Sequence, residues 1–464
     1  MYRKQIESYF EKNTEAMVNS IARLVDIPSV REAELPGKPF GEGPAAALAE
    51  ALKMGQEMGF ETRNIDNYAG VIEMGGEAKV AILAHLDVVE PGDGWDTDPF
   101  KMVMKDDGRI YGRGTSDDKG PAVAALYAMA AVREICPDLG GVRLVLGCAE
   151  ETGSECMDYY MKKEPLPTMV FSPDAEFPVI NIEKGGYGPR FSMSWEKETA
   201  EPRVISFVGG KTPNIVPGKA TAVVAGLDAS AVSKTADALN SGAVFTVAED
   251  KGTVTILCEG KPAHASTPEE GINAQTALLK LLASLPLADG VSADAVRRLN
   301  RLFPHGDWQG EAIGIKMADD ISGSLTLAFS VIDMNETGFT ALFDSRVPIC
   351  GNEDNVAAVA EKNLKAEGFT VDSSHMRPPH HVPEDSVFVR TLLKAYEKYS
   401  GRKGECIAIG GGTYVHEVEG GVAFGCTMPG TETNLHGANE SMPVEELVLS
   451  GEMFAEVILE LCGK

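Results

Sequence analysis

The sequence lacks paired or clustered cysteines. Its eight cysteines, among them Cys148, Cys156 and Cys258, are scattered and form no CxxC motif. In a long chain without a secretory signal, isolated cysteines are typical of free thiols in a reducing compartment rather than of a disulfide framework. The same spacing argues against a zinc site built from cysteine.

The sequence is also short of positive charge and of long apolar runs. It has 42 Lys and Arg residues against 69 Asp and Glu residues, which gives a net charge of -27. This charge argues against nucleic acid and against an anionic membrane as partners. The stretch MYRKQIESYFEKN has no apolar core of signal-peptide length, and no run approaches a membrane span. We therefore expect a cytoplasmic protein with no nucleic-acid or membrane partner.

What the sequence does contain is an alternation of short apolar runs and helical segments. At 464 residues the chain exceeds one ordinary hydrophobic core, which favours two or three domains. Apolar runs at Val80–Ala84, Val142–Cys148 and Thr168–Ser172 indicate strands. A final helix is expected from Val444 to Leu461, so the same alternation of strands and helices returns at the end of the chain. We predict a doubly wound α/β domain, with a mixed, mostly parallel sheet and helices on both faces.

The hydrophobic pattern changes between residues 185 and 379, where most predicted strands are half apolar or alternate apolar and polar residues. Three helices are expected there, at Ala229–Leu239, Asn273–Leu285 and Asn355–Glu367. Antiparallel strands with few helices are typical of an α+β domain that covers one face of its own sheet. The sequence therefore predicts one domain made of residues 1–184 and 380–464, interrupted by an inserted α+β lid domain of residues 185–379.

Histidine and carboxylate side chains follow several of the predicted buried strands. In VAILAHLDVV (residues 80–89), His85 ends the apolar run, and Asp87 lies two residues later on the same face of an extended chain. Open α/β sheets bind their ligands at the carboxyl ends of the strands. Other residues of this kind follow later runs or lie in glycine-rich turns: Asp117, Glu150, Glu151, Asp174 and His436. Two imidazoles with several carboxylates are a ligand set for zinc, manganese or cobalt, so these residues are candidate ligands of divalent ions.

Six motifs occur along the chain in an order that resembles a known family. They are HLDVVEPGDGW, GRGTSDDKGP, CAEETGSE, SPDAEFP, GKPAHAS and TNLHGANE. Together they resemble the metallopeptidase family of aminoacylase, carboxypeptidase G and carnosinase, and most closely its dipeptidase V branch. The resemblance covers essentially the whole chain, including the length of the insert and the GGGTY segment.

The resemblance implies a role for each candidate ligand. It implies two Zn²⁺ ions per chain, with Mn²⁺ or Co²⁺ as substitutes. Asp117 would bridge the ions, His85 and Asp174 would complete one site, and Glu151 and His436 would complete the other. Asp87 would orient His85, and Glu150 would act as the general base and then as the general acid. A cis peptide bond between Asp117 and Asp118 is also implied.

The insert is expected to supply catalytic and substrate-binding residues. By the same resemblance, His264 in GKPAHAS would donate a hydrogen bond to the developing oxyanion. Asn214 in GGKTPNIVPG and Arg346 in FDSRVP match positions that bind substrate, and the planar guanidinium suits a carboxylate. The alternative for Arg346 is an ordinary ion pair with a neighbouring acidic residue. Gly411 and Gly412 offer backbone N–H groups to a terminal carboxylate, and the alternative is a tight turn.

These expectations combine into a zinc-dependent dipeptidase that hydrolyses unblocked dipeptides through a metal-bound hydroxide, with Glu150 as base. Asp174 favours this reading, because the resemblance associates aspartate at this position with dipeptidases and aminopeptidases. One alternative is an amide hydrolase acting on N-acyl amino acids or succinyl-diaminopimelate. Another is a non-catalytic metal-binding or peptide-binding protein on the same fold, although retention of Glu150 argues against it. The long insert resembles the branch that functions as a monomer, so we expect a monomer, with a homodimer as the alternative.

Overall fold

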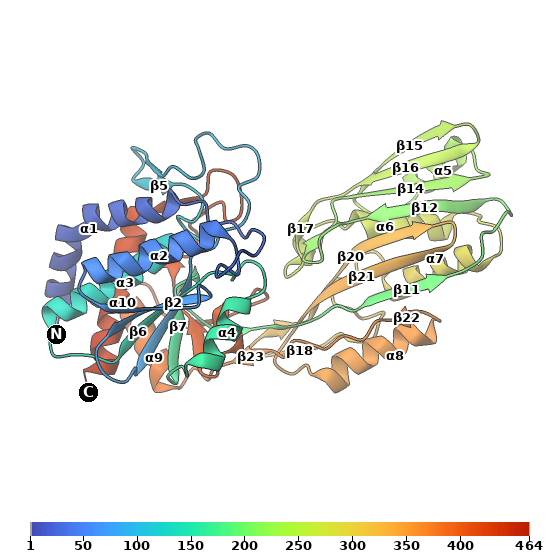
Figure 1. The fold of residues 1–464 in the computed structure, drawn as a ribbon. Coiled ribbons are helices and arrows are strands. Elements are labelled where there is room, and N and C mark those ends of the chain that lie inside the picture. The colour runs from blue at the N-terminus through green and yellow to red at the C-terminus, as the bar shows by residue number, and fades with distance from the viewer. Residues whose placement is uncertain (1, 464) are drawn as a thin grey trace. The chain divides into compact units, whose positions relative to one another are not determined.

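The computed structural model describes residues 2–463 and divides into two compact units (Figure 1). Unit 1 contains the chain up to Ile182, the segment His381–Ile407 and the chain from Gly412 onward. Unit 2 contains Glu183–His380 and the short segment Ala408–Gly411. The division predicted from the sequence places residues 380–464 in one domain and does not include the segment Ala408–Gly411 in the other.

The sheet of unit 1 is mixed, with a parallel centre. Its strands lie in the order β1 (Glu61–Ile65), β2 (Ala69–Met74), β6 (Val142–Gly147), β3 (Val80–His85), β7 (Met169–Ser172), β25 (Gly421–Ala423) and β9 (Val179–Glu183). The neighbours β6, β3, β7 and β25 run parallel, whereas β1, β2 and β9 pair in an antiparallel manner. Every residue of β3 is buried, as expected for a central strand of a sheet covered on both faces. The predicted α/β fold class is confirmed.

Unit 1 contains helices from both ends of the chain. They are α1 (Arg3–Val25), α2 (Glu42–Glu57), α3 (Lys119–Ile135), α4 (Glu155–Lys163), α9 (Val387–Ser400) and α10 (Val444–Cys462). Helix α3 is rich in alanine and buried over most of its length, so it can pack closely against α1, α10 and β3. It begins directly after Asp118, which fixes the GRGTSDDKGP loop at the amino end of a buried helix.

The strand order brings the predicted ligands to one edge of the sheet. β3 ends at His85, β6 ends three residues before Glu150, and β7 ends two residues before Asp174. Because these strands are parallel neighbours, their carboxyl ends lie side by side. Residues that end or closely follow these strands in sequence are therefore close to one another in the fold.

Unit 2 is an antiparallel sheet with helices. Across the sheet the strands are β15 (Val244–Asp250), β16 (Thr253–Glu259), β14 (Lys219–Ala225), β12 (Arg203–Gly209), β20 (Thr326–Asn335), β21 (Gly338–Val347), β11 (Arg190–Ser194) and β22 (Thr370–Val371). Its helices are α5 (Ala229–Asp237), α6 (Ala274–Ser284), α7 (Val291–Leu302) and α8 (Ala358–Ala366). One apolar core joins these strands to the helices. This architecture agrees with the α+β lid expected from the sequence.

Helix α7 corrects the expectation of three helices in this region. Its buried residues Ala295, Val296, Leu299 and Leu302 have helical spacing, so the signal was present in the sequence. The helix is only 12 residues long and directly follows the breaker-rich stretch LPLADG, which obscures the pattern. Tertiary packing of the apolar stripe into the core of unit 2 stabilises it.

Short elements complete the two units. One small sheet contains β4 (Val103–Met104), β5 (Arg109–Tyr111) and β27 (Ser441–Pro443). Three others contain two strands each: β8 (Ala175–Glu176) with β26 (Cys426–Thr427), β13 (Ile215–Val216) with β17 (Ala263–His264), and β18 (Ala318–Asp319) with β19 (Gly323–Ser324). β10 (Gly185–Tyr187) pairs with β21, and β23 (His380–His381) and β24 (Cys406–Ile409) pair with β9. The remaining helical turns are η1 (Pro268–Glu270), η2 (Glu353–Ala357) and η3 (Tyr414–Glu417). Among residues 2–463, no helix combines the length and the apolar character needed to cross a bilayer.

Candidate metal and active site

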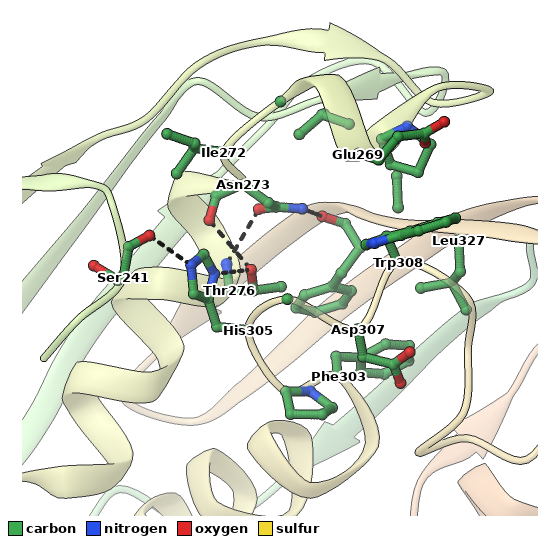
Figure 2. A pocket seen from close by; sticks show the side chains of 17 residues that line it. Ser241, Glu269, Ile272, Asn273, Thr276, Phe303, His305, Asp307, Trp308 and Leu327 are labelled. Atoms are coloured by element: carbon green, nitrogen blue, oxygen red, sulfur yellow. Dashed lines mark hydrogen bonds between the residues drawn. The ribbon is translucent and has the colours of Figure 1, made fainter.

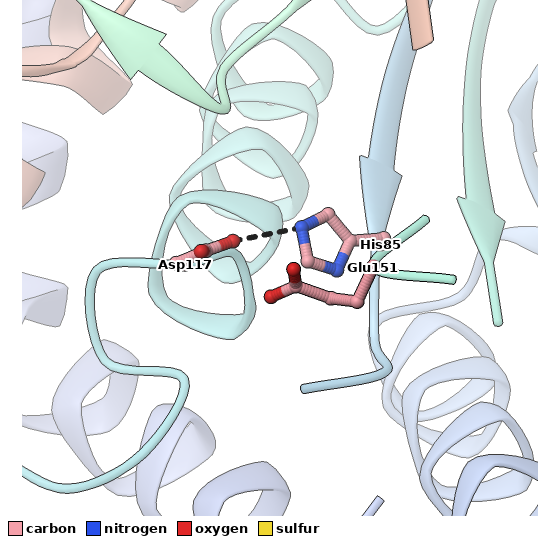
Figure 3. Close-up of side chains that lie close together, drawn as sticks. All are labelled: His85, Asp117 and Glu151. Atoms are coloured by element: carbon pink, nitrogen blue, oxygen red, sulfur yellow. Dashed lines mark ion pairs between the residues drawn. The ribbon is translucent and has the colours of Figure 1, made fainter. Parts of the chain in front are cut away.

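Asp117 presents one carboxylate oxygen to each of two imidazoles. Its Oδ1 lies 2.8 Å from Nε2 of His85, and its Oδ2 lies 2.8 Å from Nε2 of His436. Figure 3 shows the pair of His85 and Asp117 together with Glu151. A carboxylate with one oxygen directed at each of two ligand nitrogens has the arrangement expected of a group shared by two metal ions.

Two more carboxylates extend this cluster. Glu151 Oε2 lies 3.3 Å from Nε2 of His436, and Asp174 Oδ2 lies 3.5 Å from Nε2 of His85. The ligand atoms of His85, Asp117 and Glu151 lie within 4.8 Å of one another, as do those of His85, Glu150 and Asp174. The structure therefore gathers all five residues predicted as ligands, although it groups Glu151 with His85 as well as with His436.

The cluster fits a divalent cation on two grounds. Nε2 of His85 is buried and has no hydrogen-bond partner, although carboxylate oxygens lie close to it. Burial opposes protonation of His85, but the nearby carboxylates of Asp117, Asp174 and Asp87 raise its pKa well above the ordinary value. Hydrogen bonds to Asp117 and Glu151 raise the pKa of His436 to about 10 against a smaller effect of burial. The negative charge of the surrounding carboxylates thus stabilises positive charge at both imidazoles. A bound cation would supply such a positive charge.

Asp87 holds its neighbours differently from the expectation. Nδ1 of His85 lies 2.9 Å from the main-chain carbonyl oxygen of Asp87 and 3.5 Å from the side-chain Oδ1. The carboxylate instead accepts hydrogen bonds from the backbone N–H groups of Glu150, at 3.0 Å, and Glu151, at 3.1 Å. The main chain of Asp87 therefore orients the imidazole, while its side chain fixes the segment that carries both glutamates.

Glu150 has the electrostatic environment of a proton carrier. Its half-buried position raises the pKa of its carboxyl well above the ordinary value, and the negative charges of Asp174, Glu151 and Asp117 raise it further, against an opposing effect of His85. A carboxyl group with a raised pKa holds a proton more readily than an ordinary carboxylate and can pass it on during a reaction. This environment suits a general base that later acts as an acid.

Residues predicted to bind substrate from the lid lie together in unit 2. β13 pairs with β17 so that Ile215 lies opposite His264. The backbone N–H of Ala265 donates to the carbonyl oxygen of Asn214 at 2.9 Å. Asn214 and His264 are both exposed, on adjoining segments of the same small sheet. The two residues are 50 positions apart in sequence, and the family resemblance had assigned each of them to the substrate separately.

Arg346 is already engaged by an acidic neighbour. Its Nε and Nη2 donate to the two carboxylate oxygens of Asp344 at 2.7 and 2.9 Å, and Nη1 donates to the carbonyl oxygen of Gly410. The ion pair that stood as the alternative for Arg346 is therefore present in the structure. Gly411 belongs to unit 2 with Arg346, whereas Gly412 belongs to unit 1.

The comparisons with known proteins identify the family. Residues 81–460 match the model of peptidase family M20/M25/M40. The chain belongs to this family. It is 37% identical over 433 residues to the protein YtjP of Bacillus subtilis (strain 168), covering 92% of each chain. It is 36% identical over 462 residues to the Beta-Ala-Xaa dipeptidase of Lactobacillus delbrueckii subsp. lactis, covering 97% of each. The structure of human carnosine dipeptidase 1 shares its fold, with a TM-score of 0.60 and 16% sequence identity over 100% of this chain and 99% of that chain.

Sequence reasoning missed a buried ion pair that supports two of the candidate ligands in this M20 peptidase. Glu440 accepts hydrogen bonds from Nη1 of Arg113 at 2.7 Å, from the N–H of Ser116 at 2.9 Å and from the N–H of Asp117 at 3.2 Å. Nη2 of Arg113 donates to the carbonyl oxygen of His436 at 3.1 Å. The pair therefore joins the loop of Asp117 to the loop of His436. The glutamate that ends TNLHGANE and the arginine of GRGTSDDKGP were the available signals.

The backbone at the centre of the M20 site also agrees with the family resemblance. The peptide bond between Asp117 and Asp118 is cis. Oδ2 of Asp118 accepts a hydrogen bond from the backbone N–H of His85 at 3.0 Å. Asp118 therefore links the loop before α3 to the end of β3, although the sequence offered no role for its side chain.

Unit 2 of the M20 peptidase contains a cavity of about 260 Å³, shown in Figure 2. Phe303, Trp308 and His305 are among its lining residues. Nδ1 of His305 lies 2.9 Å from Oγ1 of Thr276, and Nε2 lies 2.8 Å from the carbonyl oxygen of Ser241. Both ring nitrogens are satisfied within the wall, so His305 has the environment of a structural histidine and not of a metal ligand.

Proposed function

We propose that this protein is a metal-dependent dipeptidase that hydrolyses unblocked dipeptides and uses two divalent ions, with Zn²⁺ as the first candidate and Mn²⁺ or Co²⁺ as substitutes. The observation that carries the proposal is the placement of Asp117 between His85 and His436, with one oxygen 2.8 Å from each imidazole. The 36% identity to a Beta-Ala-Xaa dipeptidase supports the choice of substrate class.

The residues divide into two ligand sets in this proposal. Asp117 would be shared, His85 and Asp174 would complete one set, and Glu151 and His436 would complete the other. Bound ions would lower the pKa of a water molecule toward about 7 and polarise the scissile carbonyl. Oxygen and imidazole ligands match the preferences of these ions, and the buried Nε2 of His85 is available to coordinate.

Glu150 is assigned the proton transfers. It would take a proton from the attacking water and deliver it to the leaving amine, so that hydrolysis ends with a free amino group and a free carboxylate. The backbone of Glu150 is held by the carboxylate of Asp87, which limits how far the base can move during the transfer. The raised pKa of Glu150 supports this double role.

The remaining predicted site residues are assigned to the substrate. His264 would donate a hydrogen bond to the developing oxyanion, and Asn214 would lie beside it, directly before the adjoining strand β13. Arg346 would bind the terminal carboxylate with the N–H groups that Asp344 and Gly410 do not use. Gly411 and Gly412 would offer backbone N–H groups to the same carboxylate.

A substrate panel on the metal-loaded enzyme tests the function. We expect turnover of free-amine dipeptides, weak turnover of N-acetyl and N-succinyl amino acids, and loss of activity on chelation with recovery on adding Zn²⁺. Glu150→Gln should bind the same metal with at least about 100-fold lower kcat, because general base catalysis contributes about 100-fold to 10,000-fold. Preferred turnover of the N-acyl compounds would replace the proposal with an amide hydrolase, and unchanged kcat in Glu150→Gln would remove Glu150 from the mechanism.

A further inference from the structure

Ser266 contacts the same ring nitrogen of His264 through two of its groups. The backbone N–H of Ser266 donates to Nδ1 of His264 at 3.2 Å. The side-chain Oγ of Ser266 lies 2.6 Å from the same Nδ1. β17 ends at His264, so the turn that follows brings Ser266 back against the imidazole.

These two contacts determine where a neutral imidazole carries its hydrogen. A nitrogen that accepts a hydrogen bond from a backbone N–H uses its lone pair, so it is unprotonated as long as that bond is formed. The Oγ–H of Ser266 must then also donate to Nδ1, because two acceptors cannot form a hydrogen bond. In the neutral ring the hydrogen therefore resides on Nε2, since one nitrogen is a donor whenever the other is an acceptor.

We infer that Ser266 is a positioning residue that fixes His264 in the Nε2–H tautomer and aims this N–H as the oxyanion donor. The inference rests on the proposed function for the role of His264, but the tautomer itself does not depend on it. An oxyanion donor is effective when it is oriented before the reaction and needs no rearrangement in the transition state. Two hydrogen bonds to Nδ1 provide that orientation.

Gly410, the first glycine of the GGGTY segment, packs closely against Ser266. A Cβ atom at Gly410 would lie 2.5 Å from Cβ of Ser266, which is closer than side-chain carbons approach. The carbonyl oxygen of Gly410 accepts a hydrogen bond from Nη1 of Arg346. Glycine at position 410 thus lets Ser266, and through it His264, pack beside the segment that Arg346 holds. Gly411 has no such contact, because its nearest neighbour is Cδ1 of Ile409 at 3.7 Å.

The test is a long-range ¹H–¹⁵N spectrum of the full-length enzyme labelled with ¹⁵N-histidine. The signals of His264 are assigned from their loss in His264→Gln, at pH 8.5, well above the ordinary imidazole pKa of about 6.5. The wild type should show an acceptor-type Nδ1 and a protonated Nε2. Ser266→Ala should shift His264 toward a mixture of tautomers and lower kcat about 3-fold to 10-fold with little change in KM, because the backbone N–H contact remains. Thr267→Ala, which leaves both contacts in place, should keep the wild-type spectrum and kcat.

Gly410→Ala and Gly411→Ala form a second, matched pair. The added methyl group at position 410 must displace Ser266, so the His264 signals should change as in Ser266→Ala, whereas Gly411→Ala should leave them as in the wild type. A protonated Nδ1 in the wild type, or unchanged tautomers and kcat in Ser266→Ala, would overturn the inference. The expected spectra without any peptide turnover would refute the proposed function and leave the assignment of the tautomer intact.

Discussion

Asp87 orients His85 through its main-chain carbonyl oxygen, 2.9 Å from Nδ1, and not through its carboxylate, whose Oδ1 is 3.5 Å away. The carboxylate is instead committed to the backbone N–H groups of Glu150 and Glu151. This division matters because replacing the side chain of Asp87 leaves the contact to the imidazole in place. The consequences of such a change should therefore appear at the two glutamates.

Asp87→Asn tests this relationship. Asparagine retains one acceptor oxygen and turns an NH₂ group toward one of the two backbone N–H groups, so the Glu150–Glu151 segment should shift. We expect the affinity for Zn²⁺ and kcat to fall by about 10-fold to 100-fold, as is typical when a residue that supports metal ligands is changed. Competition with a chelator measures the affinity. The exposed Asp320→Asn supplies the matched control, and wild-type affinity in Asp87→Asn would contradict the prediction.

Asp117→Asn should separate a shared ligand from an ordinary one. Loss of the carboxylate charge removes a ligand from both proposed sites at once, because Oδ1 faces His85 and Oδ2 faces His436. Metal analysis after dialysis should give one ion per chain or fewer, and kcat should fall at least about 1,000-fold, since several kcal/mol of charge stabilisation is lost. Glu151→Gln affects one set only and should retain one ion. Equal metal content in the two variants would argue against a bridging Asp117.

The carboxyl group of Glu452 on α10 should make the stability of the protein depend on pH. Burial and the nearby charge of Glu7 raise the pKa of its carboxyl to about 7, against an opposing effect of Arg3. In the unfolded chain this pKa is about 4.3, so the unfolded state loses the proton first as pH rises. The contribution of Glu452 to stability is therefore fully present at low pH and is lost between about pH 4 and pH 7.

Glu452→Gln should remove the loss of stability that the ionisation of this carboxyl causes as the pH rises. A shift of this size corresponds to about 4 kcal/mol if fully expressed, and solvent around the half-buried carboxyl reduces it to about 1 kcal/mol. We expect the variant to unfold at a higher temperature than the wild type at pH 8, with a smaller difference at pH 5. Differential scanning calorimetry measures both, with the exposed Glu11→Gln on α1 as control. A larger gain at pH 5 than at pH 8 would show that the sign is wrong.

The central strands could be predicted because burial on both faces leaves a continuous apolar run in the sequence. β3 and β6 carry such runs, and the predicted and observed strands differ by a residue at most at each end. β15 shows the limit of this signal. Most of its residues are exposed, and backbone pairing with β16 holds them in the sheet, so the strand carries no continuous apolar run.

The candidate ligands could be predicted because each follows a buried strand or lies in a distinctive turn, and backbone topology alone brings strand ends together. The partners of those residues could not. Whether Asp87 uses its carbonyl or its carboxylate, and whether Arg346 is paired, depends on side-chain torsions set by the whole environment. A residue such as Ser266 stands two positions from His264 in sequence, yet only the turn after β17 directs its hydroxyl at Nδ1.

Arg346 offers a test of how the lid would recognise a substrate. Asp344 occupies the Nε and Nη2 side of the guanidinium, and Gly410 accepts from Nη1, so the remaining N–H groups are fixed in direction. Lysine keeps the charge but cannot form these three contacts and present a further donor in the same plane. Arg346→Lys should therefore raise KM for a dipeptide about 10-fold to 100-fold with a smaller effect on kcat, while KM for the carboxyl-terminal amide of the same dipeptide changes little. An equal rise in KM for both compounds would place the substrate carboxylate elsewhere.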